Sequence, residues 1–137
     1  MNYTVKYIEV SSVMPHEEID PNHLSELLDL MKKDQTWRKP IVIDVNHKII
    51  LDGHHRWNIA KILGIKKIPV VELDIFDENI SVLPFREDIP VSKELVIKSG
   101  KACRLLPCKT TKHVWGKEKS PIACVVPTIN IHLSKLQ

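Results

Sequence analysis

The 137-residue sequence is poor in the residues that mark specialised classes of protein. It has three cysteines, four glycines and seven aromatic residues. Cys103, Cys108 and Cys124 are an odd number without zinc-ligand spacing, so we expect reduced structural thiols and no disulfide scaffold. No apolar run approaches the ~18 residues that span a bilayer, and the first residues lack the layout of a signal peptide. We therefore expect a soluble, cytoplasmic protein without a membrane partner.

The composition is that of an ordinary globular chain with an uneven charge distribution. Hydrophobic residues make up 43% and charged residues 27%, values that exclude a disordered chain. The length predicts one domain over residues 1–137. Of the net charge of +3, the part up to Glu78 has ten Lys and Arg against thirteen Asp and Glu, and the rest has ten against four. This division suits a small anion held between basic groups and carboxylates, and it is too mild to indicate nucleic acid.

Hydrophobic periodicity predicts an α+β fold, with two to three helices on a small mixed sheet. The predicted strands span 5–10, 40–44, 48–51, 68–73 and 79–83, with two closing strands around 122–126 and 129–133. The predicted helices span 21–33, 53–63 and the segment from Ser92 to just before Gly100. Asp20 is expected to cap the first helix, Gly64 to end the second, and Trp57 to pack in the core. Residues 36–39 and 105–116 are mostly polar and carry no predicted strand, and the chain ends could pair beside each other.

The most informative stretch is Asp52-Gly53-His54-His55-Arg56, where an apolar strand ends at an acid and a glycine opens a helix. The N–H groups and the dipole at a helix start form an anion site, and Gly53 lets a phosphate approach the backbone closely. Arg56 and the two imidazoles add donors, and Asp52 is placed to bind a Mg²⁺ ion that bridges phosphate oxygens. The alternative is that Asp52 only caps the helix and the histidines are solvated.

A second candidate is Pro15-His16-Glu17-Glu18, in the loop before the first helix. If Glu17 lies near the phosphate site, it would act as a general base and take the proton of an attacking hydroxyl. Adjacent glutamates are also typical of a solvated loop, and charge and spacing alone favour that interpretation.

The third candidate is the polar run over residues 107–113. The hydroxyls of Thr110 and Thr111 suit phosphate oxygens, and Lys109 or Lys112 would neutralise their charge. The run lacks the glycines of a Walker A loop. A charged surface loop is the alternative that these residues favour when taken alone.

These three motifs, in this order, resemble those of the ParB/sulfiredoxin-like superfamily, and Leu63-Gly64 and Ile68-Pro69-Val70 extend the likeness. Within it the chain is most similar to the free serine kinases, which use ADP or ATP. The resemblance extends over residues 5 to about 115. This sequence differs from the archaeal enzymes at Lys112, where they have arginine. The stretch between Glu72 and Leu106 is also too short for their intervening subdomain, so the acceptor could differ from serine.

The resemblance implies a phosphotransferase with an alcohol acceptor, which converts free L-serine to O-phospho-L-serine, a cysteine precursor. Glu17 would be the catalytic base, His16 would contact the substrate, and Asp52 would hold Mg²⁺ or position the phosphoryl group. The purine nucleotide, ADP or ATP, would be bound by two groups of residues: Gly53, His54, His55 and Arg56 at the helix start, and Lys109, Thr110, Thr111, Lys112 and His113 in the polar run. No motif for the base chooses between the two donors, and no oligomeric state is predicted.

Other members of the superfamily supply the alternatives. Sulfiredoxins have a reactive cysteine, and partition ParB proteins a glutamate, where this chain has His54. The alternative function is a non-catalytic ParB-like nucleotide- or DNA-binding module, which the basic second part favours. The modest charge, the few aromatic residues and the lack of a helix-turn-helix pattern oppose it. A nuclease-like activity of ParB-type folds is a third, weaker alternative.

Overall fold

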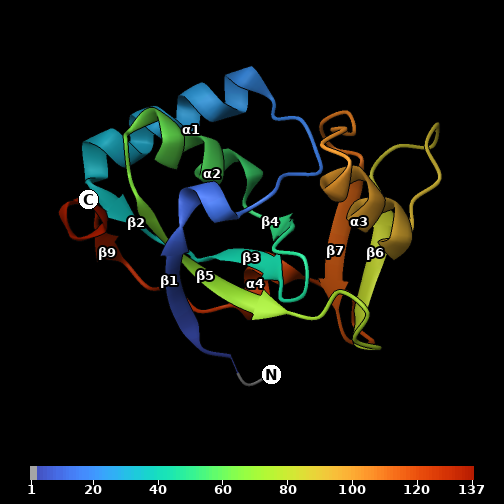
Figure 1. The fold of residues 1–137 in the computed structure, drawn as a ribbon. Coiled ribbons are helices and arrows are strands. Elements are labelled where there is room, and N and C mark those ends of the chain that lie inside the picture. Colours follow the sequence, from blue (N-terminus) through green and yellow to red (C-terminus); the bar gives the residue numbers. More distant parts are fainter. Residues whose placement is uncertain (1–2) are drawn as a thin grey trace.

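The computed structural model describes residues 3–137 and confirms the α+β architecture (Figure 1). The strands of the main sheet lie in the order β1 (Val5–Glu9), β5 (Lys67–Leu73), β3 (Ile41–Asp44) and β4 (Ile50–Asp52). β3 runs parallel to β5 and the other neighbours are antiparallel, so the sheet is mixed, as predicted. The predicted hairpin is present as β3 and β4, with a register shift between Val42 and Ile43.

Two helices, α1 (Pro21–Asp34) and α2 (His54–Ile62), lie over one face of this sheet (Figure 1). The predicted N-cap is confirmed, since Asp20 Oδ1 accepts hydrogen bonds from the backbone N–H groups of Asn22 at 2.9 Å and His23 at 3.4 Å. A 3-10 helix, η1 (Val10–Ser12), follows β1. Within residues 3–137 no helix has the length and apolar character needed to cross a membrane.

Both faces of the strand β3 are buried, which explains why the first three of its four residues are apolar. Ile41 and Ile43 belong to the core cluster under α1 and α2, whereas Val42 belongs to a second cluster on the other face. Because successive side chains of a strand point to opposite faces, a strand covered on both sides has apolar residues at successive positions. The second cluster also contains Val96 and Ile122, from the helices α3 (Lys93–Lys101) and α4 (Ile122–Val125).

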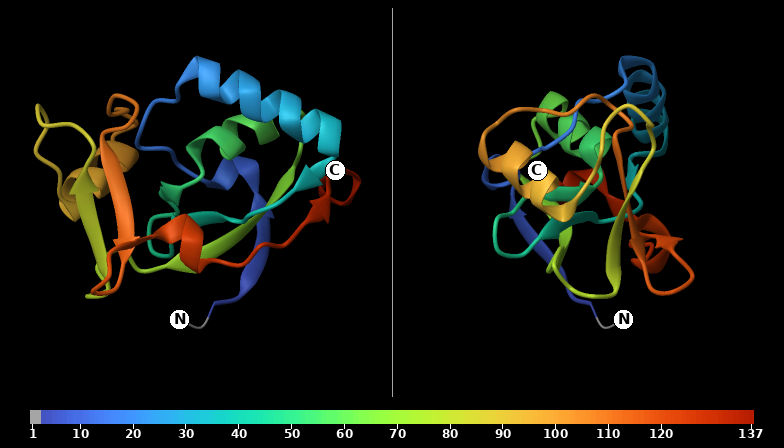
Figure 2. Two further views of the ribbon diagram at one scale, coloured as in Figure 1. Left: turned by 180° about the vertical axis from the view of Figure 1, so that it is seen from behind. Right: turned by 90° about the vertical axis from the view of Figure 1, so that its right-hand side faces the viewer.

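A three-stranded sheet with α3 stands beside the main sheet, near β4 (Figures 1 and 2). Its order is β6 (Ile80–Pro84), β7 (Thr111–Trp115) and β8 (Ser120–Pro121), all antiparallel. The strand β7 corrects the prediction for residues 105–116, for which no strand is predicted, because it forms the central strand of this sheet. Its alternate residues Thr111 and His113 are buried although both are polar.

The end of the chain also differs from the prediction. The first predicted closing strand is the short helix α4, which places Ile122 and Val126, four residues apart, in the same core cluster. The second is reduced to β9 (Ile131–His132), which pairs with β2 (Thr36–Trp37), and the 3-10 helix η2 (Leu133–Leu136) follows. The terminal strands therefore do not pair with each other, since β1 pairs with β5.

The predicted end of the third helix before Gly100 is also wrong, because α3 continues through this residue to Lys101. A Cβ at this position would lie 2.7 Å from Cδ1 of Ile49. The glycine therefore allows α3 to approach the main sheet closely and does not end the helix.

Candidate functional site

The site is built around the turn that joins β4 to α2. Gly53 has φ +107°, a conformation that favours glycine, and an added Cβ would lie 3.0 Å from Cγ1 of Ile41. The turn therefore brings the start of α2 close to β3. Within residues 3–137 no side chain caps this helix start, so the amides of its first turn are suited to an anion.

Glu17 reaches this region from the loop before α1. Its Oε1 accepts hydrogen bonds from the backbone N–H groups of Thr110 at 3.0 Å and Thr111 at 2.8 Å, and from the Thr111 hydroxyl at 3.1 Å. Burial raises the pKa of Glu17, and these hydrogen bonds oppose the rise. A half-buried carboxylate with raised pKa is suited to accept a proton.

Three buried histidines lie behind this carboxylate. The backbone N–H of His16 donates to Nε2 of His54 at 3.1 Å, and the ring of His16 meets those of His54 and His113 edge-on, at centroid distances of 4.6 and 5.8 Å. Burial lowers the pKa of His16 to about 4 and that of His113 to about 3, and it lowers the pKa of His54 well below its ordinary value. The cluster is therefore neutral at physiological pH, and it serves the site through hydrogen bonds and packing.

The two ionisable groups that flank the turn influence each other. Burial raises the pKa of the Asp52 carboxyl, while the positive charges of Arg56 and Lys39 partly offset that effect. Burial also lowers the pKa of Arg56, and the charge of Asp52 opposes this change. Asp52 therefore lies at the strand end within the electrostatic influence of two cationic side chains.

A hollow of about 190 Å³ brings many of the predicted residues together. Those that line it are His16, Glu17, Asp52, Gly53, His54, His55, Lys109 and Thr111. Arg56, Thr110, Lys112 and His113 do not line it. Arg56 lies instead in a small hollow against α1, and the Lys112 ammonium lies 5.8 Å from the ring centroid of Phe85. The Thr110 hydroxyl donates to the carbonyl of Pro107.

The hollow also contains residues that the sequence motifs did not predict for the site. Asp20 donates its backbone N–H to Nε2 of His55 at 3.0 Å, which ties the start of α1 to that of α2. Phe85 lines the hollow although it is 58% exposed, and Cys108 lines it although a purely structural thiol was expected. A phenylalanine within a stretch rich in proline and charge was the one available sequence signal for Phe85, whose exposure only the structure shows. Nothing in the spacing of the cysteines indicated Cys108.

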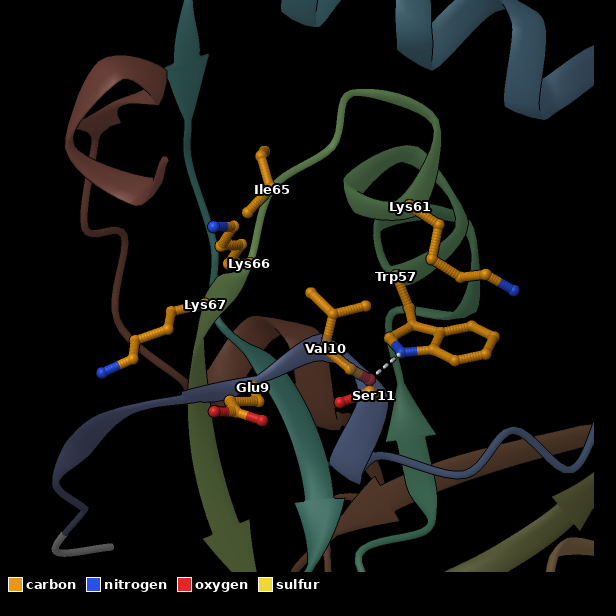
Figure 3. Close-up of a pocket in the computed structure, with 8 residues that line it drawn as sticks. All are labelled: Glu9, Val10, Ser11, Trp57, Lys61, Ile65, Lys66 and Lys67. Carbon is orange, nitrogen blue, oxygen red and sulfur yellow. Dashed lines mark hydrogen bonds between the residues drawn. The ribbon is translucent and has the colours of Figure 1, made fainter.

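A larger hollow of about 640 Å³ lies apart from these residues and includes Trp57 (Figure 3). The expected core position of Trp57 is only partly right, since the residue packs against the first core cluster but is half-buried. Its indole N–H donates to the carbonyl of Val10 at 3.0 Å, and the Lys61 ammonium lies 4.4 Å from the ring centroid. In Figure 3 that ammonium is on the opposite side of the indole from Lys66 and Lys67.

The residues present fit a Mg²⁺ ion that also takes oxygens from a bound phosphate. Among residues 3–137 no group of three His, Cys, Asp or Glu side chains has the geometry to hold a metal by itself. Asp52 supplies carboxylate oxygens to the hollow, and Mg²⁺ commonly binds through one or two carboxylates plus substrate phosphates. Asp52 therefore fits the predicted metal ligand.

Comparison with known proteins gives relatives of two kinds. An ATP-dependent L-serine kinase of Staphylothermus marinus is 37% identical over 118 residues, which are 82% of this chain and 47% of that protein. A ParB-like protein of Sulfolobus acidocaldarius is 33% identical over 81 residues, which are 59% of this chain and 40% of that protein. The chain thus spans about half or less of the length of these curated relatives.

The solved structure described as a free serine kinase in complex with AMP has the same fold, with a TM-score of 0.83 at 17% identity. The alignment covers 97% of this chain and 93% of that chain. The sequence model of the ParB N-terminal domain family matches residues 2–87, which include β1 to β6, Glu17 and the turn at Gly53. This chain therefore belongs to the ParB N-terminal domain family.

Proposed function

We propose that this chain catalyses the transfer of a phosphoryl group from ADP or ATP to the hydroxyl of free L-serine, giving O-phospho-L-serine. One observation carries the proposal: the Glu17 carboxylate lines the same hollow as Gly53, His54 and His55 at the start of α2. The proposed base thus lies next to the proposed anion site, an arrangement that suits phosphoryl transfer to a hydroxyl. The L-serine kinase of S. marinus, at 37% identity, supports serine as the acceptor.

In the proposed reaction the proton of the serine hydroxyl passes to Glu17 as the O–H bond breaks. The serine oxygen forms a new bond to the terminal phosphorus, and the bond from that phosphorus to the leaving nucleotide oxygen breaks with its electron pair on the nucleotide. The amides at the start of α2, with Lys109 beside them, would stabilise the charge on the transferred group. Mg²⁺, when bound at Asp52, would neutralise charge on the phosphate oxygens.

The choice of donor remains part of the proposal. The S. marinus relative is an ATP-dependent enzyme, whereas a relative in Thermococcus kodakarensis, 28% identical over 102 residues, is an ADP-dependent L-serine kinase. Both nucleotides end in a phosphoryl group that the start of α2 would bind in the same way. The three free cysteines fit a reducing, cytoplasmic setting for the reaction.

The direct test measures phosphoserine by mass spectrometry after incubating the protein with Mg²⁺, L-serine and either ADP or ATP. We expect product with at least one donor, and a loss of about 10²- to 10⁴-fold in Glu17→Gln, as for removal of a general base. The glutamine keeps an oxygen for the amides of Thr110 and Thr111, so the fold should be retained. Lys66→Ala, in the larger hollow, is the matched control and should keep full activity. A Glu17→Gln protein as active as wild type would remove Glu17 from the base position.

The second candidate is a non-catalytic ParB-like module that binds nucleotide or DNA, which the family match over residues 2–87 favours. Its test is a mobility shift with duplex DNA at low and moderate salt, since binding through phosphates weakens steeply as salt rises. Salt-sensitive DNA binding together with no phosphoserine from either donor would replace the kinase proposal by this one.

A further inference from the structure

The two carboxylate oxygens of Glu17 have different surroundings. Oε1 accepts three hydrogen bonds, from the N–H groups of Thr110 and Thr111 and from the Thr111 hydroxyl, at 2.8 to 3.1 Å. Among the side-chain hydrogen bonds of residues 3–137 none involves Oε2, and the backbone of Lys109 adds a further contact that lowers the pKa of the carboxyl. One oxygen is therefore held by the protein, and the other remains available to take a proton.

The Thr111 hydroxyl also contacts His16, and the proton count decides the direction of that contact. A hydroxyl has one proton, and Thr111 donates it to Glu17, which as a carboxylate can only accept. Thr111 Oγ1 must then accept from Nε2 of His16, 3.0 Å away. His16 is 1% exposed and neutral, so with its single proton on Nε2 its Nδ1 carries none. Nδ1 is buried and has no hydrogen-bond partner in residues 3–137, while the backbone of Ile50 raises the pKa of the ring against the larger effect of burial.

We propose that His16 and Thr111 are positioning residues for the base, joined in a chain of donors in which His16 Nε2–H fixes the Thr111 hydroxyl and this hydroxyl fixes Oε1 of Glu17. The inference rests on the proposed function and gives these two residues a task other than contact with substrate or nucleotide. These hydrogen bonds occupy Oε1 of Glu17, so that the proton of the serine hydroxyl goes to Oε2. These hydrogen bonds join the loop before α1, which carries His16 and Glu17, to the strand β7 at Thr111. The backbone of His16 extends the connection to His54 of α2.

Several other titratable groups line the same hollow as Glu17 and contribute to the electrostatic environment that sets its pKa. They are His16 and Glu18 on its own segment, Cys108 and Lys109 on the loop before β7, Asp20 before α1, and Asp52, His54 and His55 at the turn into α2. The variants below leave all of them in place except His16, which is neutral. A shift in the pKa of Glu17 therefore reports the donor chain itself.

The first test compares Thr111→Val with Thr111→Ser in the pH dependence of kcat/KM for L-serine. Valine keeps the shape of threonine but removes the hydroxyl, so one of the hydrogen bonds that lower the pKa of Glu17 is lost. The base must be ionised to act, so the acidic limb should move to higher pH, and kcat/KM at neutral pH should fall about tenfold. Thr111→Ser keeps the hydroxyl and should restore the wild-type limb. The same limb in both variants would overturn the proposal.

The second test asks whether His16 acts through its Nε2 proton. His16→Gln places an amide donor near that position, whereas His16→Leu fills similar space without a donor. We expect His16→Leu to shift the acidic limb as Thr111→Val does, and His16→Gln to recover part of the shift. Since both replacements disturb the histidine packing, the difference between them is the informative quantity. Equal limbs in the two variants would assign His16 to packing alone.

A third measurement does not depend on kinase activity. A ¹³C NMR titration of labelled glutamate carboxyls, with the Glu17 signal assigned by Glu17→Gln, gives the pKa directly in the wild type, Thr111→Val and Thr111→Ser. A higher pKa only in Thr111→Val supports the donor chain even if the wild type makes no phosphoserine, in which case the proposed function alone fails. Equal pKa values in an active enzyme overturn the donor chain and leave the kinase in place.

Discussion

The backbone N–H of His16 donates to Nε2 of His54 at 3.1 Å, although 38 residues separate them in the sequence. This bond ties the loop that carries the proposed base directly to the first residue of α2. It also requires that Nε2 of His54 carry no proton, which agrees with the lowered pKa of this buried ring. Loop, helix start and base are therefore fixed relative to one another by buried neutral groups.

Removing this acceptor should destabilise the fold. In His54→Leu the buried N–H of His16 loses its partner, which is expected to cost about 1–3 kcal/mol of unfolding free energy. His54→Gln offers an amide oxygen near the position of Nε2 and should recover part of the loss. Urea denaturation of the three proteins measures the difference, with exposed Lys66→Ala as a control near the wild-type value. Equal stability of the leucine and glutamine variants would contradict this account.

The stability of the protein should respond to pH through Glu17 and Asp52. Burial raises the pKa of both carboxyls in the folded state above their ordinary values of 4.5 and 3.8. For each carboxyl, the folded state therefore binds more protons than the unfolded state at pH values between its unfolded pKa and its folded pKa. The stability of the protein falls as pH rises through that interval. Glu17→Gln and Asp52→Asn remove the titrating group. Both variants should gain Tm relative to the wild type at pH 7, and the gain should vanish at about pH 3, below the unfolded pKa values. A gain of equal size at both pH values would assign the effect to packing.

Gly100→Ala should be destabilising although alanine normally favours a helix by about 1 kcal/mol over glycine. The new methyl group would meet Cδ1 and Cγ1 of Ile49, both 2.7 Å away, inside a packed core. Overpacking of this kind costs about 1–3 kcal/mol. Adding Ile49→Val, which removes Cδ1, should recover part of the loss in a double-mutant cycle, while Lys101→Ala on the exposed side of α3 should change stability little. A stabilised Gly100→Ala protein would show that α3 can shift away from the sheet.

Asp44 should be among the carboxylates on which the fold depends most. It is fully buried and accepts from the backbone N–H of His47 at 2.9 Å, from Nδ1 of His47 at 3.0 Å and from the backbone N–H of Ile75 at 3.0 Å. Asp44→Ala leaves these donors without a partner and should cost about 3 kcal/mol. Asp44→Asn keeps one acceptor oxygen and should lose less. Thermal unfolding checks the order, which would be contradicted if the asparagine variant were the less stable of the two.

Features encoded within a few neighbouring residues were predictable. The helix α1 follows from Asp20, Pro21 and the spacing of its leucines, and the turn at Gly53 follows from an acid and a glycine between a strand and a helix. Each needs only local backbone preferences and one apolar face. The order of the three motifs further predicted the ParB-type fold, which the family match and the shared fold support.

The errors concern segments whose partners lie far away in the chain. β7 has alternating residues, but Thr111 and His113 are polar and are buried because His16 and Glu17 lie against them. Ile122 and Val126 are compatible with a strand or a helical turn, and the second core cluster selects the helix. In both cases the local pattern is ambiguous, and packing supplies the free energy that decides it.

The sequence by itself determined the helix starts, the strand–glycine–helix turn and the residue types available for phosphate chemistry, because these depend on local propensities and spacing. Only the tertiary structure decided that Glu17 meets Thr110 and Thr111 across 93 and 94 residues of chain, and that Arg56 and Lys112 do not line the hollow beside Glu17. Contacts of that separation form when two sheets pack together. Their geometry follows from how both core clusters fill space, which no local pattern specifies.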